Sequence, residues 1–274
     1  MQTLRGKVAV ITGAGSGIGR ALAEHLAKEG CALALADIHA ESLQRLSAEL
    51  KGSSVRVTTH VLDVANRAAV YSFADEVLAQ HGSAQLIINN AGVSVSQTVV
   101  DLTYDDFEWL MGINFWGVVY GTKAFLPHLL KNNDGHIVNV SSVFGFIGVP
   151  TQSAYNASKF AVRGFTEALG QELAQTGVRV SCVHPGGIKT SIARSARFYR
   201  DHKGNQDASR SAANFDKIAR TTPAEAARVI IDGVKRDQPR ILIGADAHLI
   251  DSVQRLLPVS YTRILAKIAS AAGD

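Results

Sequence analysis

Short apolar runs alternate with longer amphipathic stretches along the chain. Most of the short runs lack a polar residue at every second position, which predicts strands covered on both faces. The predicted strands are residues 8–12, 32–37, 55–64, 86–89, 136–141, 178–184 and 240–243. The helical patterns between them cover residues 18–29, 40–50, 67–80, 105–130, 154–175 and 223–235. Gly30, Gly52, Gly82 and Gly177 stand where helices are expected to end.

This strict alternation predicts the α/β class and a doubly wound, Rossmann-like parallel sheet of about seven strands, with helices on both faces. No linker-like run divides the 274 residues, so we expect a single domain over residues 1–274. Ligands bind beyond the carboxyl ends of the strands in such sheets. The irregular segment 191–222 is expected over that edge as a substrate-covering lid.

The tail of the chain, residues 247–274, is expected to be helical. Within it, residues 248–268 read as an amphipathic helix interrupted by Pro258. Packing or subunit contact is the ordinary explanation of such a helix, and association with a membrane surface is the alternative. No apolar stretch is long enough to span a bilayer, so we expect no stable membrane insertion.

Composition narrows the class of protein further. With 46% hydrophobic and 19% charged residues the chain can bury one sizeable core, and its net charge of only +4 gives no sign of nucleic-acid binding. Residues 194–220 hold seven basic and three acidic side chains. That excess either attracts an anionic substrate or partner, or belongs to a solvated, mobile surface stretch.

Cys31 and Cys182 are far apart and lie in apolar runs. Buried free thiols in a reducing compartment are the expected interpretation. The first seven residues pass directly into a strand-like run and leave no room for a signal peptide. We therefore expect a soluble, cytoplasmic protein.

A glycine-rich segment, residues 12–20, joins the first predicted strand to the first helix. It lacks a literal G-x-G-x-x-G, but its glycines permit a tight turn and close backbone approach. The helix start would present unpaired N–H groups and a positive dipole to a pyrophosphate. A purely structural turn is the alternative. The candidate cofactor contacts here are Gly13, Ser16, Gly17, Ile18 and Gly19.

Asp37 ends the second predicted strand, 18 residues after Gly19. A carboxylate at that distance can accept hydrogen bonds from the adenosine ribose hydroxyls and would repel a 2′-phosphate. Ile38 and His39 follow it instead of a basic residue, and Ser16 occupies the glycine loop. The pattern predicts NAD as the preferred cofactor over NADP. The alternative role of Asp37 is the N-cap of the helix that starts at residue 40.

Several further motifs follow the glycine turn along the sequence. They are Asn89-Asn90-Ala91-Gly92, Asn114, Ser142, Tyr155 with Lys159, and the run from Pro185 to Thr190. Together they resemble the short-chain dehydrogenase/reductase (SDR) family, which is NAD(P)-dependent, over residues 7 to about 246. The resemblance implies an oxidoreductase that moves a hydride between NAD(H) and a secondary alcohol or ketone, an EC 1.1.1 activity.

The chemistry accounts for the residue types that carry this resemblance. Tyr155 and Lys159 are four residues apart and share a helix face, so the ammonium, helped by a positive nicotinamide, is expected to lower the phenol pKa for proton transfer. By resemblance Ser142 binds the substrate oxygen, although Ser141 is a rival. Asn114 would hold a water relay behind Lys159; its alternative is a helix residue bonded to nearby backbone.

The resemblance also implies further cofactor contacts. Asp63 and Val64 would meet the adenine, and the segment after residue 89 would meet a ribose. Ile188 and Thr190 would meet the carboxamide and determine which nicotinamide face is exposed. Each can instead be turn chemistry. The remaining residues expected at the cofactor are Asn90, Ala91, Gly92, Tyr155, Lys159, Pro185 and Gly186.

The substrate is expected to be a small-molecule alcohol or ketone with a bulky hydrophobic body, of steroid, retinoid, aromatic or acyl type. The nearby arginines leave a carboxylate or CoA-linked substrate open. Relatives of this kind imply a homodimer or homotetramer built on the long helices. The candidates for an apolar pocket are Val93, Val95, Val143, Phe144, Phe146, Ile147, Val149, Ile192, Phe198, Tyr199 and Phe215.

Two other classes of protein share parts of this pattern. A zinc alcohol dehydrogenase catalyses the same overall reaction, but two distant cysteines and scattered histidines do not form a tetrahedral site, so no metal is expected. An NAD-binding sensor or interaction protein could keep the fold without turnover, because fold does not determine function.

Overall fold

The computed structural model describes residues 1–201 and 203–264. Its centre is a parallel sheet of seven strands in the order β3-β2-β1-β4-β6-β7-β9, which confirms the predicted doubly wound α/β fold. The strand order reverses between β1 and β4, and in sheets of this kind ligands bind beyond the carboxyl ends of the strands at such a reversal. The strands are β1 (Val8–Thr12), β2 (Ala32–Asp37), β3 (Val57–Val61), β4 (Leu86–Asn89), β6 (Gly135–Val140), β7 (Val178–Pro185) and β9 (Arg240–Ile243).

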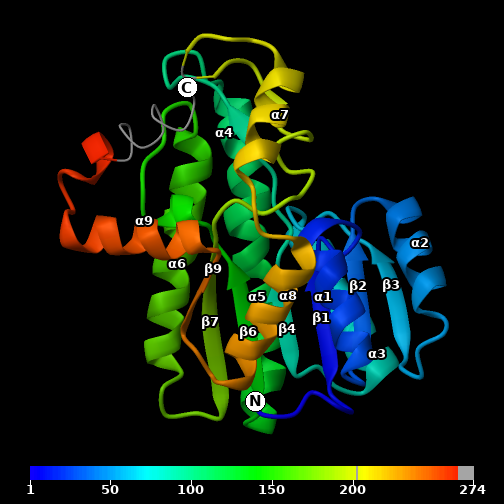
Figure 1. The fold of residues 1–274 in the computed structure, drawn as a ribbon. Coiled ribbons are helices and arrows are strands. Elements are labelled where there is room, and N and C mark those ends of the chain that lie inside the picture. The colour runs from blue at the N-terminus through cyan, green and yellow to red at the C-terminus, as the bar shows by residue number, and fades with distance from the viewer. Residues whose placement is uncertain (202, 265–274) are drawn as a thin grey trace.

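Helices cover both faces of this sheet (Figure 1). One apolar cluster packs α1 (Gly17–Lys28), α2 (Ala40–Leu50) and α8 (Pro223–Lys235) against the first face. A second packs α3 (Arg67–His81), α5 (Gly117–Asn132) and α6 (Ser153–Glu172) against the other. Burying both faces explains why most of the strands are continuously apolar.

β3 departs from the expected pattern. It is five residues long instead of ten, and it forms the outer edge of the sheet. Only His60 of this strand is buried, whereas Val61 is 66% exposed. β3 is thus an exception among the predicted strands, most of which are covered on both faces. Asp63 and Val64 consequently lie in the loop beyond the strand and do not end it.

Three of the four glycines expected at helix ends stand there, since Gly52 follows Lys51, the C-cap of α2, as Gly30 follows Glu29, the C-cap of α1. Gly82 caps α3 with φ of 74°, and Gly30 follows α1 with φ of 80°. Gly52 and Gly177 have no positive φ, and α6 ends before the residue at 177. A Cβ on Gly177 would stand 1.8 Å from the Asn133 carbonyl oxygen, so close backbone approach explains this glycine instead.

The long helix predicted over residues 105–130 is three consecutive helical segments. They are α4 (Tyr104–Met111), a π-helical turn η1 (Gly112–Trp116) and α5. The π-turn contains Asn114, one of the candidate site residues. π-turns are frequent at functional positions because the extra residue re-aims the side chains around it.

Segment 191–222 is more regular than expected. Besides α7 (Ala208–Ile218), it contains β8 (Arg197–Phe198), which pairs in parallel with β5 (Val95–Ser96). Figure 1 shows α7 beyond the carboxyl ends of the strands, beside the outer end of α4. The pairing of β5 with β8 attaches this segment to the loop that leaves β4.

The C-terminal region begins with α9 (Ala245–Leu256), and Pro258 follows its end. The rest of the predicted amphipathic helix, from residue 265, lies outside the described residues. Cys31 and Cys182 are buried free thiols, as expected. No helix within the described residues is long and apolar enough to cross a membrane.

Candidate active site

The glycine-rich segment turns sharply between β1 and α1. Gly13 and Gly17 have φ of 64° and 52°, which other residues rarely adopt. A Cβ on Gly19 would lie 2.1 Å from the Gly13 carbonyl oxygen, so only glycine lets the helix start close on the turn. Ser16, the N-cap, makes no side-chain capping bond. The amides of Ile18 and its neighbours therefore remain available to an anion at this helix start.

Asp37 sits directly under this turn. Its Oδ2 accepts a hydrogen bond from the Gly15 amide at 2.8 Å, and its Oδ1 accepts one from the His39 amide at 3.0 Å. The N-cap of α2 is His39, so the alternative of Asp37 as that N-cap was wrong. Each carboxylate oxygen has a further lone pair, which fits a hydroxyl-bearing ribose beside the turn.

Thr12 and Asn90 tie the ends of β1 and β4 together. Thr12 Oγ1 accepts hydrogen bonds from the amides of Asn90 and Ala91, at 3.0 and 3.2 Å. Asn90 Nδ2 donates in return to the carbonyls of Thr12 and Gly13, at 3.0 and 3.2 Å. The Asn90 side chain thus holds the glycine turn in place. Sequence reasoning quoted Thr12 within a motif but missed this bridging role.

Asp63 and Val64 differ in their surroundings. Asp63 is exposed and its Oδ1 accepts a hydrogen bond from the Ala65 amide at 2.9 Å. Val64 is buried and packs so closely on Gly117 that a Cβ there would stand 2.8 Å from Val64 Cγ2. The structure thus gives Asp63 a turn bond and Val64 a packing contact.

Asn114 is fully buried and fastens the loop after β4. Its Oδ1 accepts a hydrogen bond from the Val93 amide at 2.8 Å, and its Nδ2 donates to the Val93 carbonyl at 2.9 Å. The same Nδ2 lies 3.2 Å from Ser158 Oγ on α6. A Cβ on Gly92 would stand 3.3 Å from Asn114 Oδ1 and 3.6 Å from Lys159 Nζ. Gly92 therefore leaves room where these two polar groups approach each other.

Lys159 and Tyr155 share one face of α6. Lys159 Nζ donates to the Val140 carbonyl at 2.9 Å and lies 5.5 Å from the centre of the Tyr155 ring. Two of its three N–H groups have no hydrogen-bond partner among the described residues. The ammonium is thus held at the carboxyl end of β6 with donors to spare.

Ser142 completes the group. Its side chain interacts with the Tyr155 hydroxyl and acts to lower its pKa, and Ser142 Oγ accepts a hydrogen bond from the Phe144 amide at 3.1 Å. Ser141, the rival, is buried and donates to the Lys159 carbonyl at 2.8 Å. Ser141 thus contacts the backbone of α6 at Lys159, whereas Ser142 lies at the Tyr155 side chain on the preceding turn of the same helix.

The protein groups around Tyr155 do not by themselves lower its pKa, contrary to the expectation. Burial among protein groups raises the pKa of Tyr155 to about 12, while the Ser142 hydrogen bond acts in the lowering direction. Burial also lowers the pKa of Lys159 to about 8. The low-dielectric surroundings penalise both charged forms, and a sequence pattern does not report that burial.

The segment after β7 approaches the glycine turn from the other side. Thr190 is so near that a Cβ on Gly17 would stand 3.2 Å from its Cγ2. Ile188 is buried and bridges to Thr221. The Gly187 amide donates to Asp246 Oδ2 at 2.6 Å, and a Cβ on Gly186, just after Pro185, would meet the same carboxylate. Asp246 is a residue that sequence reasoning missed.

The apolar pocket candidates divide into two groups. Val93 and Val95 pack with Tyr155. Val143, Phe144, Phe146, Ile147 and Val149 form a second cluster. Ile192, Phe198, Tyr199 and Phe215 belong to neither of these clusters. The structure thus divides the single expected grouping into two clusters that meet at Tyr155, whose ring centre lies 5.9 Å from that of Phe144.

The arginines of segment 194–220 are partly paired. Arg197 donates to Asp106 at 2.8 Å, and its guanidinium lies 3.6 Å from the centre of the Trp109 ring. Arg200 lies 3.4 Å from Asp101, and Arg194 lies 2.6 Å from Asp216. Two of these pairs fasten the segment to α4 and the loop before it. Neither the solvated nor the anion-binding interpretation anticipated this use.

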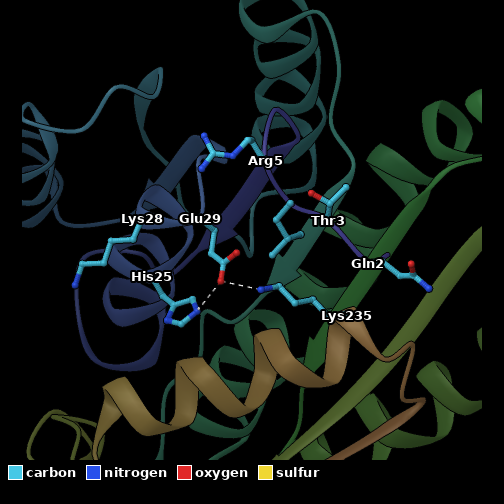
Figure 2. A pocket seen from close by; sticks show the side chains of 8 residues that line it. Gln2, Thr3, Arg5, His25, Lys28, Glu29 and Lys235 are labelled. Atoms are coloured by element: carbon cyan, nitrogen blue, oxygen red, sulfur yellow. Dashed lines mark hydrogen bonds and ion pairs between the residues drawn. The ribbon is translucent and has the colours of Figure 1, made fainter.

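A separate cleft of about 430 Å³ opens near the N-terminal end of β1 (Figure 2). Glu29 in this cleft pairs with Lys235 at 2.7 Å and with His25 at 3.6 Å. None of the candidate site residues lines it. Among the described residues no group of three His, Cys, Asp or Glu side chains is placed to hold a metal ion.

Comparison with known proteins agrees with this geometry. Residues 7–200 match the family model described as short chain dehydrogenase. A putative oxidoreductase SadH of Mycobacterium tuberculosis is 47% identical, with 97% of this chain and 96% of that protein covered. Estradiol 17-beta-dehydrogenase 11 of Homo sapiens is 33% identical, with coverage of 100% and 86%.

A crystal structure of a short chain dehydrogenase/reductase from Burkholderia phymatum in complex with NAD has a TM-score of 0.84, 32% identity and 97% coverage of both chains. Fold and side-chain arrangement define an oxidoreductase of the dinucleotide-dependent class. The chain belongs to the short-chain dehydrogenase/reductase family. Members of that family bind NAD or NADP and act on small molecules.

Proposed function

We propose that this protein is an NAD-dependent dehydrogenase/reductase that interconverts secondary alcohols and ketones. The observation that carries the proposal is the convergence of Ser142, Tyr155, Lys159 and Asn114 at the carboxyl ends of β4 and β6. The glycine turn that ends β1 lies next to them. NAD, when bound, supplies the hydride acceptor or, when reduced, the hydride donor.

The residues of the chain then handle the oxygen and its proton. Ser142 donates a hydrogen bond to the substrate oxygen and fixes it beside the Tyr155 hydroxyl. During oxidation Tyr155 takes the alcohol proton, and during reduction it returns one to the carbonyl oxygen. Lys159 stabilises the phenolate as the proton leaves, which offsets the burial that raises the pKa of Tyr155.

Asn114 serves the same proton path from behind. Its side chain holds the loop at Val93 and contacts Ser158 on α6, so it fixes the spacing between that loop and Lys159. The space beside Gly92, between Asn114 and Lys159, is where we place a water relay to solvent.

Asp37 supports the preference for NAD. Its buried carboxylate lies under the glycine turn and has lone pairs for ribose hydroxyls, whereas a 2′-phosphate would meet an uncompensated negative charge. Two unit charges about 4 Å apart interact by roughly 4 kcal/mol near a protein surface, before screening by salt.

The remaining contacts complete a cradle around the cofactor. We assign the pyrophosphate to the turn at Gly13 through Gly19, the adenine to the loop at Asp63 and Val64, and the carboxamide to Ile188 and Thr190. The close approach of Thr190 to Gly17 supports a site that encloses the cofactor from both sides of the crevice.

We infer a bulky, hydrophobic substrate. The apolar side chains packed around Tyr155 support it, and so does the name of the human relative, an estradiol dehydrogenase. Segment 191–222 is proposed to cover this substrate. The buried thiols fit a cytoplasmic location, and the long helices α5 and α6 offer the surface for a homodimer or homotetramer.

The deciding experiment is a panel of steroid, retinoid, aromatic and aliphatic alcohols and ketones, each with NAD and with NADP, followed at the nicotinamide absorbance. We expect turnover with a hydrophobic secondary alcohol or ketone and a preference for NAD. Tight NAD binding without turnover on any member would instead support a sensor or interaction protein.

A further inference from the structure

His184 is a fully buried polar residue next to the proposed active site that has no role in the mechanism above. It lies on β7, directly before Pro185, and is 0% exposed. Its Nδ1 lies 3.0 Å from the carbonyl oxygen of Ser142. Ser142 therefore contacts Tyr155 with its side chain and His184 with its backbone carbonyl.

The chemistry of this contact defines the state of the imidazole. A carbonyl oxygen only accepts hydrogen bonds, so Nδ1 must carry the proton and donate it. Burial lowers the pKa of His184 to about 4, which keeps the ring neutral. Its Nε2 is then an unprotonated acceptor, and it has no hydrogen-bond partner within residues 1–201 and 203–264.

The bond from His184 acts on a turn that decides where the serine hydroxyl stands. The Ser142 carbonyl also accepts the Gly145 amide at 2.9 Å, and Ser142 Oγ accepts the Phe144 amide at 3.1 Å. Ser142 is thus the N-cap of the short helix η2 (Val143–Gly145). Rotation of this peptide would move the hydroxyl away from Tyr155.

His184 is itself held rigidly. The centre of the Phe146 ring lies 5.1 Å from the centre of the His184 imidazole. On the Phe146 ring, the Arg240 guanidinium lies 5.0 Å from the ring centre. Arg240 is in turn paired with Asp251 on α9. A chain of contacts thus runs from Asp251 on α9 through Arg240, Phe146 and His184 to the Ser142 peptide.

We propose that His184 is a positioning residue, which orients the Ser142 hydroxyl toward the substrate oxygen through the Ser142 carbonyl. The proposal rests on the proposed function, because it needs the serine to act on substrate. A buried acceptor left unpaired is costly, and here it accompanies a donor bond that sets the geometry of the site.

The test compares His184→Phe with His184→Asn in the full chain. Phenylalanine fills the space without donating, and it should lower kcat about tenfold to hundredfold while the KM for NAD stays unchanged. Asparagine can donate from a position close to that of Nδ1, so it should recover most of the turnover. Equal losses in both variants would contradict the proposal.

His136 provides a matched control. It is also 0% exposed, lies on the neighbouring strand β6, and hydrogen-bonds Ser181 at 2.7 Å instead of a site residue. His136→Phe should leave kcat per folded molecule unchanged. A loss equal to that of His184→Phe would show that the effect comes from disturbing any buried histidine.

A double-variant cycle separates positioning from general packing. In a Ser142→Ala background, His184→Phe should cause little further loss of kcat, because the hydroxyl that it orients is gone. Fully additive losses would overturn the proposal. If the wild-type protein shows no turnover on any substrate, it is the proposed function that fails, and this cycle then has no activity to measure.

Discussion

The two ends of the central sheet are built from similar residues but use them differently. At the amino ends of the strands, His136 bonds Ser181, and Ser181 Oγ donates to the Gln238 carbonyl at 2.6 Å. The nearby cleft is closed by Lys235 and His25 on Glu29. The Ser181 hydroxyl and the Glu29 carboxylate at this end are thus paired with neighbours, while His136 Nδ1 has no hydrogen-bond partner among the described residues.

At the carboxyl ends, polar groups retain unused bonding capacity. Lys159 has spare donors among the described residues, Asp37 has spare lone pairs, and Ser142 shares its hydroxyl with Tyr155. In sheets of this kind loops diverge at this edge and helix N-termini point toward it, so polar groups here can keep bonding capacity for a ligand. The comparison teaches that reactivity follows from incomplete satisfaction, not from residue type.

Of the changes at the carboxyl ends of the strands, removal of the Tyr155 hydroxyl should have the largest effect on turnover. Tyr155→Phe keeps the packing but deletes the proton carrier, so turnover should fall by several orders of magnitude. NAD affinity, measured by fluorescence titration, should stay nearly unchanged. Turnover near the wild-type level would refute the assigned role.

Acid should destabilise both ends of the sheet through their buried histidines. Burial lowers the pKa of His184 and of His136 to about 4, below the usual value of 6.5. The unfolded chain therefore takes up protons first. Stability is full above pH 6.5 and declines as pH falls toward 4, by roughly 3 kcal/mol per histidine.

Denaturant unfolding between pH 7 and pH 4 checks this expectation. His184→Asn and His136→Phe should each flatten the decline of the unfolding free energy, because each removes one group that the folded state keeps neutral. A pH profile identical to that of the wild-type protein in both variants would contradict it.

Replacing the acid under the glycine turn should have an intermediate effect. Asp37→Ala removes the acceptor for ribose hydroxyls and the charge that opposes a 2′-phosphate. The NAD over NADP ratio of kcat/KM should fall about tenfold to hundredfold. An unchanged ratio would mean that selectivity arises elsewhere. Asp63→Ala, at an exposed site, is the matched control and should change the ratio little.

Weakening the contact between segment 191–222 and α4 should have the smallest effect on stability and substrate binding. Burial opposes ionisation of Asp106, but hydrogen bonds from Arg197, Tyr199 and Thr103 outweigh it, so the pKa of Asp106 is lowered. Arg197→Ala should cost about 1 kcal/mol of stability, because the guanidinium is partly exposed. It should raise substrate KM a fewfold. Arg194→Ala, at an exposed pair on the same segment, should change neither.

How far the sequence predicted the site depends on the range of the interaction. Tyr155 and Lys159 share a helix face because they are four residues apart, and Ser142 precedes them at a strand end. The hydrogen bond of Asn114 with Val93, the packing of Arg197 on Trp109 and the contact of Asp246 with Gly187 join distant segments. No local pattern encodes such contacts.

The sequence by itself determined the order of strands and helices, the glycine turn and the family, because these follow from periodicity, backbone freedom and motif spacing. Only the tertiary structure decided that Tyr155 is harder to ionise than expected, that the apolar residues divide into two groups, and that His184 supports Ser142. Those properties depend on burial and on neighbours from other segments of the chain, and both arise only when helices and loops pack on the sheet.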